Sequence, residues 1–276
     1  MKAGLVQLCS SDDPVANLPV TETLVREAAG AGAAFVLTPE VTNCISTSRA
    51  HQLEVLQVEG EDLTLARLCA VAAELGIWLL IGSLAIKTEG KRFANRSFLI
   101  GPNGEIRARY DKIHMFDVEL GDGENYRESA GYRPGEMAVL ARTPMAKIGM
   151  TICYDLRFPH LYRKLAQAGA QILTVPSAFT RSTGAAHWHV LLRARAIENG
   201  CFVLAPAQTG SHPGSPRRTY GHSLVVNPWG EVIAEAGTEP EVLIAELALD
   251  ECALARARIP SLQHDREFEG DERHNQ

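Results

Sequence analysis

The chain has 276 residues, of which 46% are hydrophobic and 22% charged, a balance typical of a soluble globular protein that can bury a large core without disulfides or metals. Its net charge is −6, and its basic residues form no cluster larger than a pair, such as Arg217-Arg218 in a loop rich in Gly, Ser and Pro. These features argue against a nucleic-acid-binding protein, which needs a clustered basic surface.

In the first half of the chain, short apolar runs alternate with helical patterns, which favours a layered α/β architecture. Pro39 stops the second apolar run, and Gly76 stops a helical one. The sequence Gly-Pro-Asn-Gly at 101–104 predicts the turn of a hairpin. The expected strands are 3–9, 34–38 and 77–84, the expected helices are 22–30 and 60–76, and the hairpin spans 95–110.

The second half repeats this rhythm after the segment 117–137, which is rich in Gly, Glu and Arg and predicts a long functional loop. A surface loop is also expected at 209–218. Because no low-complexity linker divides the chain, one domain over 1–276 is predicted, with two sheets between helical layers. The remaining expected strands are 146–152, 172–175, 201–207 and 242–247, with a hairpin over 222–233 and helices over 159–168, 187–199 and from Asp250.

No targeting pattern is visible. The first strand runs into polar residues at 10–13 without the apolar core of a signal peptide, and no apolar run reaches membrane-spanning length. The sequence therefore predicts a cytoplasmic protein. Its six cysteines form no C-x-x-C pair, which argues against a zinc knuckle or a dithiol redox motif.

Cys153 is the cysteine in polar surroundings. It follows the apolar run 148–152 and precedes a helix that begins at Pro159. At such an elbow, free backbone N–H groups can lower the pKa of a thiol and bind an oxyanion. By position alone, Cys153 fits an inert buried thiol as well as a nucleophile.

Two charged residues also stand at the ends of expected segments. Glu40 comes after a strand end, where α/β folds place their sites, although a loop or capping glutamate fits that position too. Lys112 follows the expected hairpin. Its position fits either a fixed cation in a pocket or a lysine on the surface. His114 fits a local hydrogen bond better than a metal ligand, because no second ligand stands at a suitable spacing.

Together these residues resemble the signature of the nitrilase, or carbon–nitrogen hydrolase, superfamily, which carries a Glu, a Lys and a Cys in this order, each at a strand end. The resemblance covers nearly the whole chain, through 38–40, 111–114 and 152–159. It implies an α/β fold, a four-layer α-β-β-α sandwich. It also implies no cofactor and no metal, a small-molecule amide substrate, no nucleic acid or membrane partner, and a homodimer or larger homo-oligomer.

Within this family the chain is most similar to the Nit-type amidases, for example at 112–117 and 227–230. The stretches 177–180 and 191–198 are more like the branch that hydrolyses deaminated glutathione than the omega-amidase branch, which acts on 2-oxoglutaramate. The resemblance thus implies an amidase for a small substrate that carries carboxylates, with deaminated glutathione expected first. A nitrilase and an N-carbamoyl hydrolase are further alternatives.

The resemblance also assigns roles. Cys153 would attack the amide carbonyl and form a thioester, while Glu40 would move protons, best with a pKa shifted towards neutrality by burial. Lys112 and the backbone N–H of Tyr154 would stabilise the oxyanion, and Glu128 would orient Lys112 and help to position the substrate.

Further contacts are predicted around the nucleophile. Arg193, on a helix with an apolar stripe, is expected to hold the scaffold through a buried ion pair. His187 and Trp188 fit either the pocket or a subunit contact. The residues expected to bind substrate, because they adjoin the site along the chain, are Tyr154, Arg157, Phe179 and Thr180, with Arg181 as a further candidate.

Two other classes of protein compete with this interpretation. One is a non-catalytic scaffold with the same fold, against which the intact Glu, Lys and Cys set argues. The other is a metal-dependent amidohydrolase, for which the nine histidines are too scattered.

Overall fold

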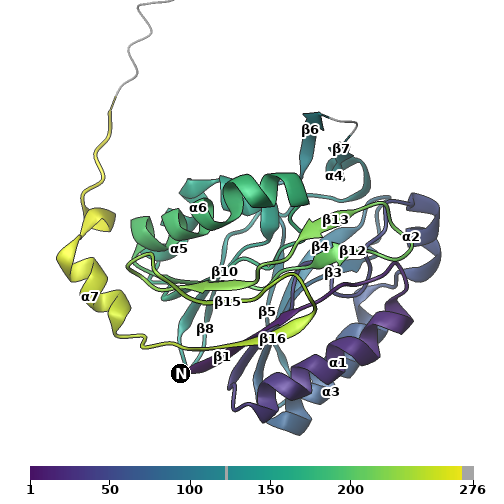
Figure 1. Ribbon diagram of the computed structural model, residues 1–276, viewed down its shortest axis with the longest axis horizontal. Helices are drawn as coiled ribbons and strands as arrows, with labels where there is room; N and C mark the ends of the chain where they lie inside the picture. The colour runs from purple at the N-terminus through teal and green to yellow at the C-terminus, as the bar shows by residue number, and fades with distance from the viewer. Residues whose placement is uncertain (122–123, 269–276) are drawn as a thin grey trace, which may run out of the picture.

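The computed structural model describes residues 1–121 and 124–268, and in this part of the chain two six-stranded sheets lie face to face (Figure 1). Helices α1 (Pro14–Gly30) and α3 (Leu63–Leu75) cover one sheet, and α5 (Pro159–Gln167) and α6 (Arg181–Asn199) cover the other. The predicted four-layer α-β-β-α sandwich is thereby confirmed. The predicted domain over 1–276 stays a prediction, and its last residues, 269–276, lie outside the described part.

The first sheet has the order β16-β1-β2-β3-β4-β5, in which β1, β2 and β3 are parallel. Its side chains alternate between two cores: Phe35 and Leu37 pack between the sheets, whereas Val36 packs with the helices. The strands are β1 (Lys2–Gln7), β2 (Phe35–Leu37), β3 (Trp78–Ile86), β4 (Ala94–Ile100), β5 (Ile106–Asp111) and β16 (Glu241–Glu246).

The second sheet has the order β15-β14-β11-β10-β9-β8 and again a parallel centre, β9, β10 and β11. Because both faces of these central strands are covered, they form continuous apolar runs, which made them visible in the sequence. The strands are β8 (Val139–Arg142), β9 (Lys147–Met150), β10 (Ile172–Thr174), β11 (Phe202–Ala205), β14 (Leu224–Val226) and β15 (Val232–Glu235).

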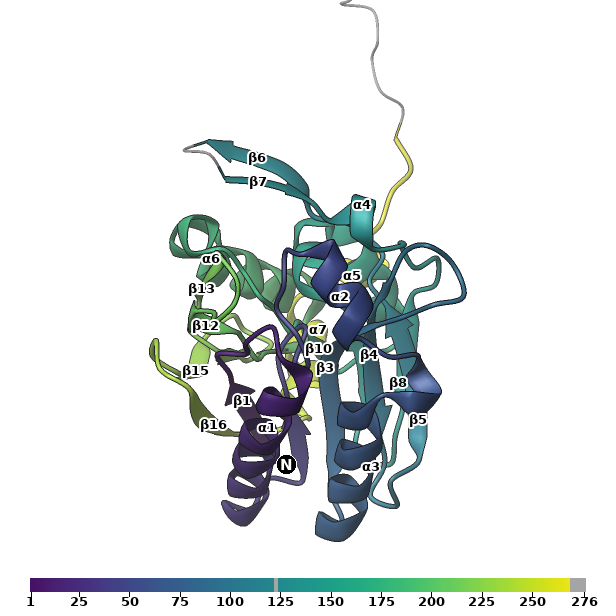
Figure 2. The same cartoon turned by 90° about the vertical axis from the view of Figure 1, so that its right-hand side faces the viewer.

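The two expected loops were wrong in part. The segment 117–137 contains a hairpin of β6 (Asp117–Gly121) and β7 (Glu124–Arg127) and the short helix α4 (Glu128–Gly131), while its residues 122–123 lie outside the described part. Figure 2 shows this hairpin projecting from the body of the molecule. It pairs with neither main sheet, so it lacks the apolar face by which a strand is recognised. The other loop contributes β12 (Thr209–Ser211), which pairs with β13 (Arg218–Tyr220).

Two helices begin earlier than expected. Helix α6 starts at Arg181 rather than His187, and α1 starts at Pro14, where the Asp13 side chain accepts hydrogen bonds from Val15 and Ala16. None of the helices in the described residues is long and apolar enough to cross a membrane. The remaining elements are α2 (Arg49–Val55), η1 (Glu59–Glu61), η2 (Cys153–Arg157), α7 (Glu251–Arg258) and η3 (Ser261–Gln263).

A buried histidine ties β12 and β13 to the loop after β1. The Nδ1–H of His212 donates to the carbonyl of Ser10 at 2.8 Å, and its Nε2 accepts from the hydroxyl of Thr219 at 2.8 Å. Burial lowers the pKa of His212 to about 4. The folded protein therefore holds this imidazole neutral.

Acid should destabilise the protein through His212. Above the ordinary histidine pKa the residue makes no pH-dependent contribution, and below it the unfolded chain binds the extra proton. The free energy of unfolding should fall by about 2–3 kcal/mol between pH 7 and pH 4.5 from this residue. Urea unfolding of the wild type and of His212→Gln at both pH values measures the difference. An identical loss of stability in both proteins would contradict this assignment.

Candidate functional site

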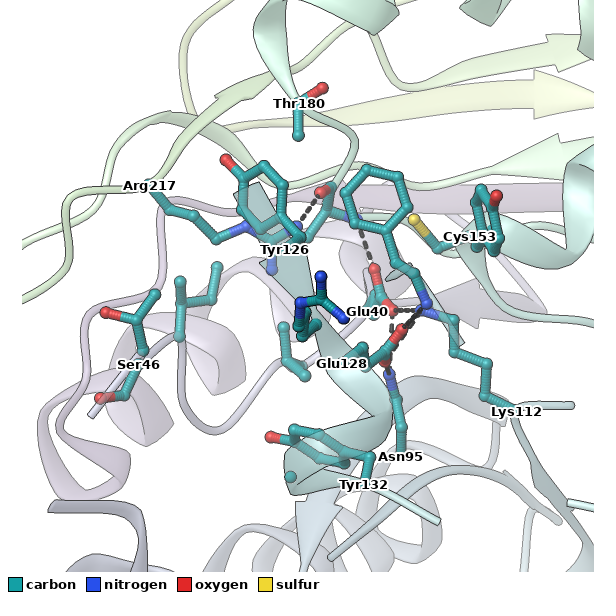
Figure 3. A pocket seen from close by; sticks show the side chains of 18 of the residues that line it. Glu40, Ser46, Asn95, Lys112, Tyr126, Glu128, Tyr132, Cys153, Thr180 and Arg217 are labelled. Atoms are coloured by element: carbon teal, nitrogen blue, oxygen red, sulfur yellow. Dashed lines mark hydrogen bonds and ion pairs between the residues drawn. The ribbon is translucent and has the colours of Figure 1, made fainter. Parts of the chain in front are cut away.

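A cavity of 420 Å³ opens where strands of both sheets end. Glu40 lies just after β2, Cys153 follows β9, and Ala178 follows β10. The carboxyl ends of parallel strands meet at one edge of each sheet, and the packing of the two sheets brings these edges to the same cavity. Figure 3 shows Glu40, Lys112, Glu128 and Cys153 around this cavity.

Lys112 holds the two glutamates together. It is 2% exposed, and its Nζ lies 2.8 Å from Oε1 of Glu40 and 2.8 Å from Oε2 of Glu128. The second oxygen of Glu40 accepts from the backbone N–H of Ala178 at 2.8 Å, and Oε2 of Glu128 also accepts from the N–H of Phe116 at 2.7 Å. A buried ion pair is stable only when its remaining polar atoms are bonded, as they are here.

Asn95, on β4, is a site residue that sequence reasoning missed. Its Nδ2 donates to Glu40 at 2.9 Å and to Glu128 at 3.2 Å, so it bridges the two carboxylates below Lys112 (Figure 3). Its Oδ1 is buried without a partner among the described residues. A polar residue in an apolar strand was the only available signal, and Ser97 on the same strand shares it without lining the cavity.

Cys153 begins the short helix η2, as expected for an elbow, with φ at 46°. A non-glycine residue in this left-handed region stores strain on the order of 1–3 kcal/mol. Asp155 holds the turn, because its Oδ2 accepts from the N–H of Ile152 at 2.9 Å and from the hydroxyl of Tyr110 at 2.7 Å. Arg195 on α6 donates to the carbonyl of Leu156 from the other side. The thiol position is therefore fixed by contacts with several elements.

The charges of the site act on one another. Burial raises the pKa of the Cys153 thiol, and the neighbouring Glu40 carboxylate raises it further. Burial alone would also raise the pKa of Glu40, but Lys112 and Arg217 outweigh it, so that this pKa lies below its ordinary value. Burial opposes the charge of Lys112, yet Glu128 and Glu40 raise its pKa overall. The resting site thus holds a neutral thiol beside a carboxylate and an ammonium, and the expected shift of Glu40 towards neutrality was wrong.

The predicted substrate residues are only partly brought together. Tyr154, Phe179 and Thr180 line the cavity, whereas Arg157 and Arg181 are not among the described residues that line it. Arg157 lies instead beside the exposed His187, with 3.2 Å between Nη2 and Nδ1. The side chain of an arginine one helical turn after the nucleophile is long enough to reach either the cavity or the surface beside His187. The sequence alone could not decide between these two positions.

The other expectations for α6 resolve differently. Trp188 is fully buried, with its ring 5.1 Å from that of Phe179, so it is a core residue behind the cavity wall. Arg193 donates to the carbonyl of Gly230 and makes no ion pair among the described residues. The buried arginine of this helix is Arg195, which pairs with Glu198 at 2.8 Å. The expected buried ion pair thus lies on the predicted helix, but Arg195 forms it and Arg193 does not.

Arg217, which looked like part of an isolated basic pair, lines the cavity. Its Nη2 donates to the carbonyl of Ala178 at 2.6 Å, while its Nε is buried without a partner among the described residues. No local sequence signal could have found it, because the β12–β13 hairpin brings it across the cavity. Other lining residues missed from the sequence are Arg49, Tyr126, Arg127 and Tyr132.

Comparisons with known proteins agree with this geometry. The family model for carbon–nitrogen hydrolases matches residues 2–257. The chain is 40% identical over 266 residues to a Yersinia enterocolitica protein named deaminated glutathione amidase, a match that covers 95% of this chain and 92% of that protein.

Solved structures agree as well. The C. elegans NitFhit protein matches with a TM-score of 0.89 and 34% identity over 96% of this chain, which spans 65% of the NitFhit chain. An amidase from Nesterenkonia sp. AN1 matches with a TM-score of 0.81 and 27% identity, over 96% of this chain and 94% of that one. That structure is of a glutamate-to-glutamine mutant with the acetamide moiety of fluoroacetamide added covalently at the active-site cysteine.

Proposed function

This chain belongs to the carbon–nitrogen hydrolase family, and from that premise we propose that it is an amidase with Cys153 as nucleophile, Glu40 as general base and acid, and Lys112 as the cation that binds the oxyanion. One observation carries the proposal. The buried thiol, the buried carboxylate and a buried ammonium that bonds this carboxylate at 2.8 Å all line one cavity. These are the nucleophile, base and electrostatic stabiliser that amide hydrolysis requires.

In the acylation step, Sγ of Cys153 attacks the carbonyl carbon of the amide while Glu40 takes the thiol proton. The new C–S bond moves negative charge onto the carbonyl oxygen, which Lys112 and the backbone N–H of Tyr154 stabilise. The C–N bond then breaks, and Glu40 gives its proton to the departing nitrogen. The acid part of the substrate remains as a thioester.

Deacylation reverses these roles. Glu40 takes a proton from a water molecule that attacks the thioester carbon, again with the oxygen negative and held by Lys112. The C–S bond breaks as the proton passes from Glu40 to the sulfur. The free acid leaves, and the site returns to a neutral thiol beside a carboxylate.

The lowered pKa of Glu40 is compatible with this chemistry. At rest, Lys112 stabilises the Glu40 carboxylate and makes it a weak base. When the oxyanion forms beside Lys112, its negative charge cancels part of that stabilisation, and Glu40 binds the thiol proton more strongly. Glu128 keeps the ammonium in place throughout, with bonds of 3.0 and 2.8 Å to its two oxygens.

The cavity supports a substrate that carries a carboxylate. Its volume of 420 Å³ is in the range that holds a ligand much larger than acetamide. Three arginines line it, but Arg49 already donates to the carbonyls of Gly131 and Lys91, and Arg127 is largely exposed. Among the described residues, Arg217 is the arginine with a buried, unpaired N–H, the kind of donor that a carboxylate satisfies best.

We therefore propose deaminated glutathione, which the named relatives act on, as the substrate. A panel of amides tests this, with ammonia or amine release measured for deaminated glutathione, 2-oxoglutaramate, an N-carbamoyl amino acid and a simple nitrile. The highest kcat/KM is expected for deaminated glutathione. A preference for the nitrile would contradict the substrate, whereas turnover of none of the four would contradict the amidase itself.

Arg217→Gln should raise KM for the carboxylate-bearing amide by about 10–100-fold, the worth of a hydrogen bond between charged partners. Because Arg217 also lowers the pKa of Glu40, kcat should change as well, but by less than KM. Steady-state kinetics on this variant and on Arg218→Gln, its exposed neighbour, measure the effect. An equal rise in KM for a neutral amide would show that Arg217 does not bind the carboxylate of the substrate.

The proposal includes a homodimer. Large apolar side chains of α6 and of the β14–β15 turn are exposed, among them Val190, Ile197 and Trp229. Such side chains are common at contacts between subunits. Light scattering should give twice the mass of the chain. The cytoplasmic location expected from the sequence stays a prediction.

A further inference from the structure

Three potential metal ligands lie together away from the catalytic residues. His189 is on α6, His222 follows β13, and Glu235 ends β15. Nε2 of His189 and Nδ1 of His222 each lie 2.9 Å from the same carboxylate oxygen of Glu235, and the three ligand atoms lie within 4.8 Å of one another. None of the three residues is among those that line the 420 Å³ cavity in the described part of the chain.

The donor set suits a transition metal. Two imidazoles and one carboxylate, with a fourth position open to water, form a known zinc-binding arrangement, with ligand atoms about 2.0–2.2 Å from the ion. A central ion at those distances requires the donor atoms to stand roughly 3.3 Å apart. The two histidine nitrogens lie 2.9 Å from Glu235, and all three donor atoms lie within 4.8 Å of one another, so an ion would require rotations of these side chains.

Backbone contacts fix the position of His222, and all three side chains are partly accessible to solvent. The backbone of His222 is fixed, since its N–H donates to Gly237 at 3.0 Å and its carbonyl accepts from Nε1 of Trp188 at 2.8 Å. Its ring is stacked on Tyr220, with 4.5 Å between centroids. The ligand side chains of His189, His222 and Glu235 are 33%, 26% and 37% exposed, which lets an ion and a water molecule enter.

Charge also favours a cation. Two neutral imidazoles and a carboxylate carry one net negative charge. Among the described residues, Glu235 shares hydrogen bonds with these two histidines and forms an ion pair with no lysine or arginine. A divalent ion would replace the shared hydrogen bonds with direct bonds to all three groups.

We propose that His189, His222 and Glu235 bind one divalent transition-metal ion, Zn²⁺ foremost, at a structural site separate from the catalytic cavity. The ion would join α6 to β15. Helix α6 carries Trp188, behind the cavity wall, and Arg195, which holds the turn after Cys153. The metal would therefore stabilise the helix that supports the site without taking part in the reaction.

Calorimetric titration of the chelator-treated, full-length protein with Zn²⁺ tests this. The wild type should bind one ion per chain, and His189→Gln and Glu235→Gln should each bind it at least about 100-fold more weakly. Zn²⁺ at about 100 times its Kd should raise the Tm of the wild type by about 5 °C and leave both variants unchanged. His187→Gln, two residues before His189 on the same helix, is the matched control and should bind as the wild type does.

The visible absorption spectrum of bound Co²⁺ identifies the type of ligand atoms. Bound at the proposed site, it should give the visible d–d absorption of tetrahedral nitrogen and oxygen ligands, without the sulfur charge-transfer band that Cys153 would produce. Equal Zn²⁺ affinity in the wild type and Glu235→Gln would overturn the proposal, as would binding lost in Cys153→Ala. Melting curves without metal, together with unchanged amidase rates, verify that the cluster variants are folded.

Discussion

Amide hydrolysis should fall by on the order of 10⁴–10⁶-fold in Cys153→Ala, because the variant has no atom that can form the thioester. The fold should survive. The change removes a single sulfur atom and leaves the same left-handed backbone, which alanine adopts at a cost close to that of cysteine. Measurements of kcat and of urea unfolding, made on one preparation, separate the loss of chemistry from a loss of structure.

Cys201→Ala is the matched control. Cys201 is equally buried, its Sγ donates to the carbonyl of Ala170, and it does not line the cavity. This variant should lose stability but keep kcat. An acid-quenched sample of the wild type should carry the mass of the acyl group, and Cys153→Ala should not.

These experiments also test the competing class of a non-catalytic scaffold. Such a protein would show no acyl adduct, and its Cys153 would react with a substrate-like electrophile no faster than the other buried thiols. If Cys153→Ala retained more than about a hundredth of the wild-type kcat, another residue would have to be the nucleophile.

Lys112→Met should be nearly as damaging, for two separable reasons. Loss of the oxyanion cation costs on the order of 10²–10³ in kcat. In addition, Glu40 and Glu128 would face each other across the site without the charge that holds them together. Breaking a buried ion pair in this way costs about 3–5 kcal/mol of stability.

The pH dependence distinguishes these two effects. In the wild type the pKa of Glu40 is depressed, so the carboxylate base is present above its ordinary pKa and activity is lost only as the pH falls through the lowered value. Without Lys112 the pKa of Glu40 rises, and the acidic limb of kcat/KM must move to higher pH. A profile of kcat/KM against pH measures the shift.

Lys112→Arg tests charge against shape. If charge alone mattered, arginine would restore the acidic limb even where its bulk lowers kcat. The exposed Lys147 provides the matched control, because it is not among the described residues that line the cavity. An acidic limb that stays in place in Lys112→Met would refute the coupling between Lys112 and Glu40.

Taken together, Glu40, Lys112 and Cys153 could be proposed from the sequence, although the position of each residue alone also fits a structural role. The parallel centre of each sheet places Glu40 and Cys153 beyond the carboxyl ends of their strands, and the packing of the two sheets brings these ends to one cavity. The family resemblance added the order of the three residues. The apolar alternation predicted two sheets between helical layers, and the resemblance implied the four-layer α-β-β-α sandwich.

Tertiary structure alone decided the rest. Asn95 bridges the two glutamates from near the start of β4, and Arg217 reaches the cavity across a hairpin that looked like a loop. His189, His222 and Glu235 meet from three segments whose spacing in the sequence gives no signal. The physical reason is common to all of them. Local sequence determines which segments are strands, whereas the pairing of strands and hairpins in the folded chain determines which polar side chains meet. The same tertiary contacts place Lys112 and Arg217 near Glu40. They lower the pKa of Glu40, although burial alone would raise it.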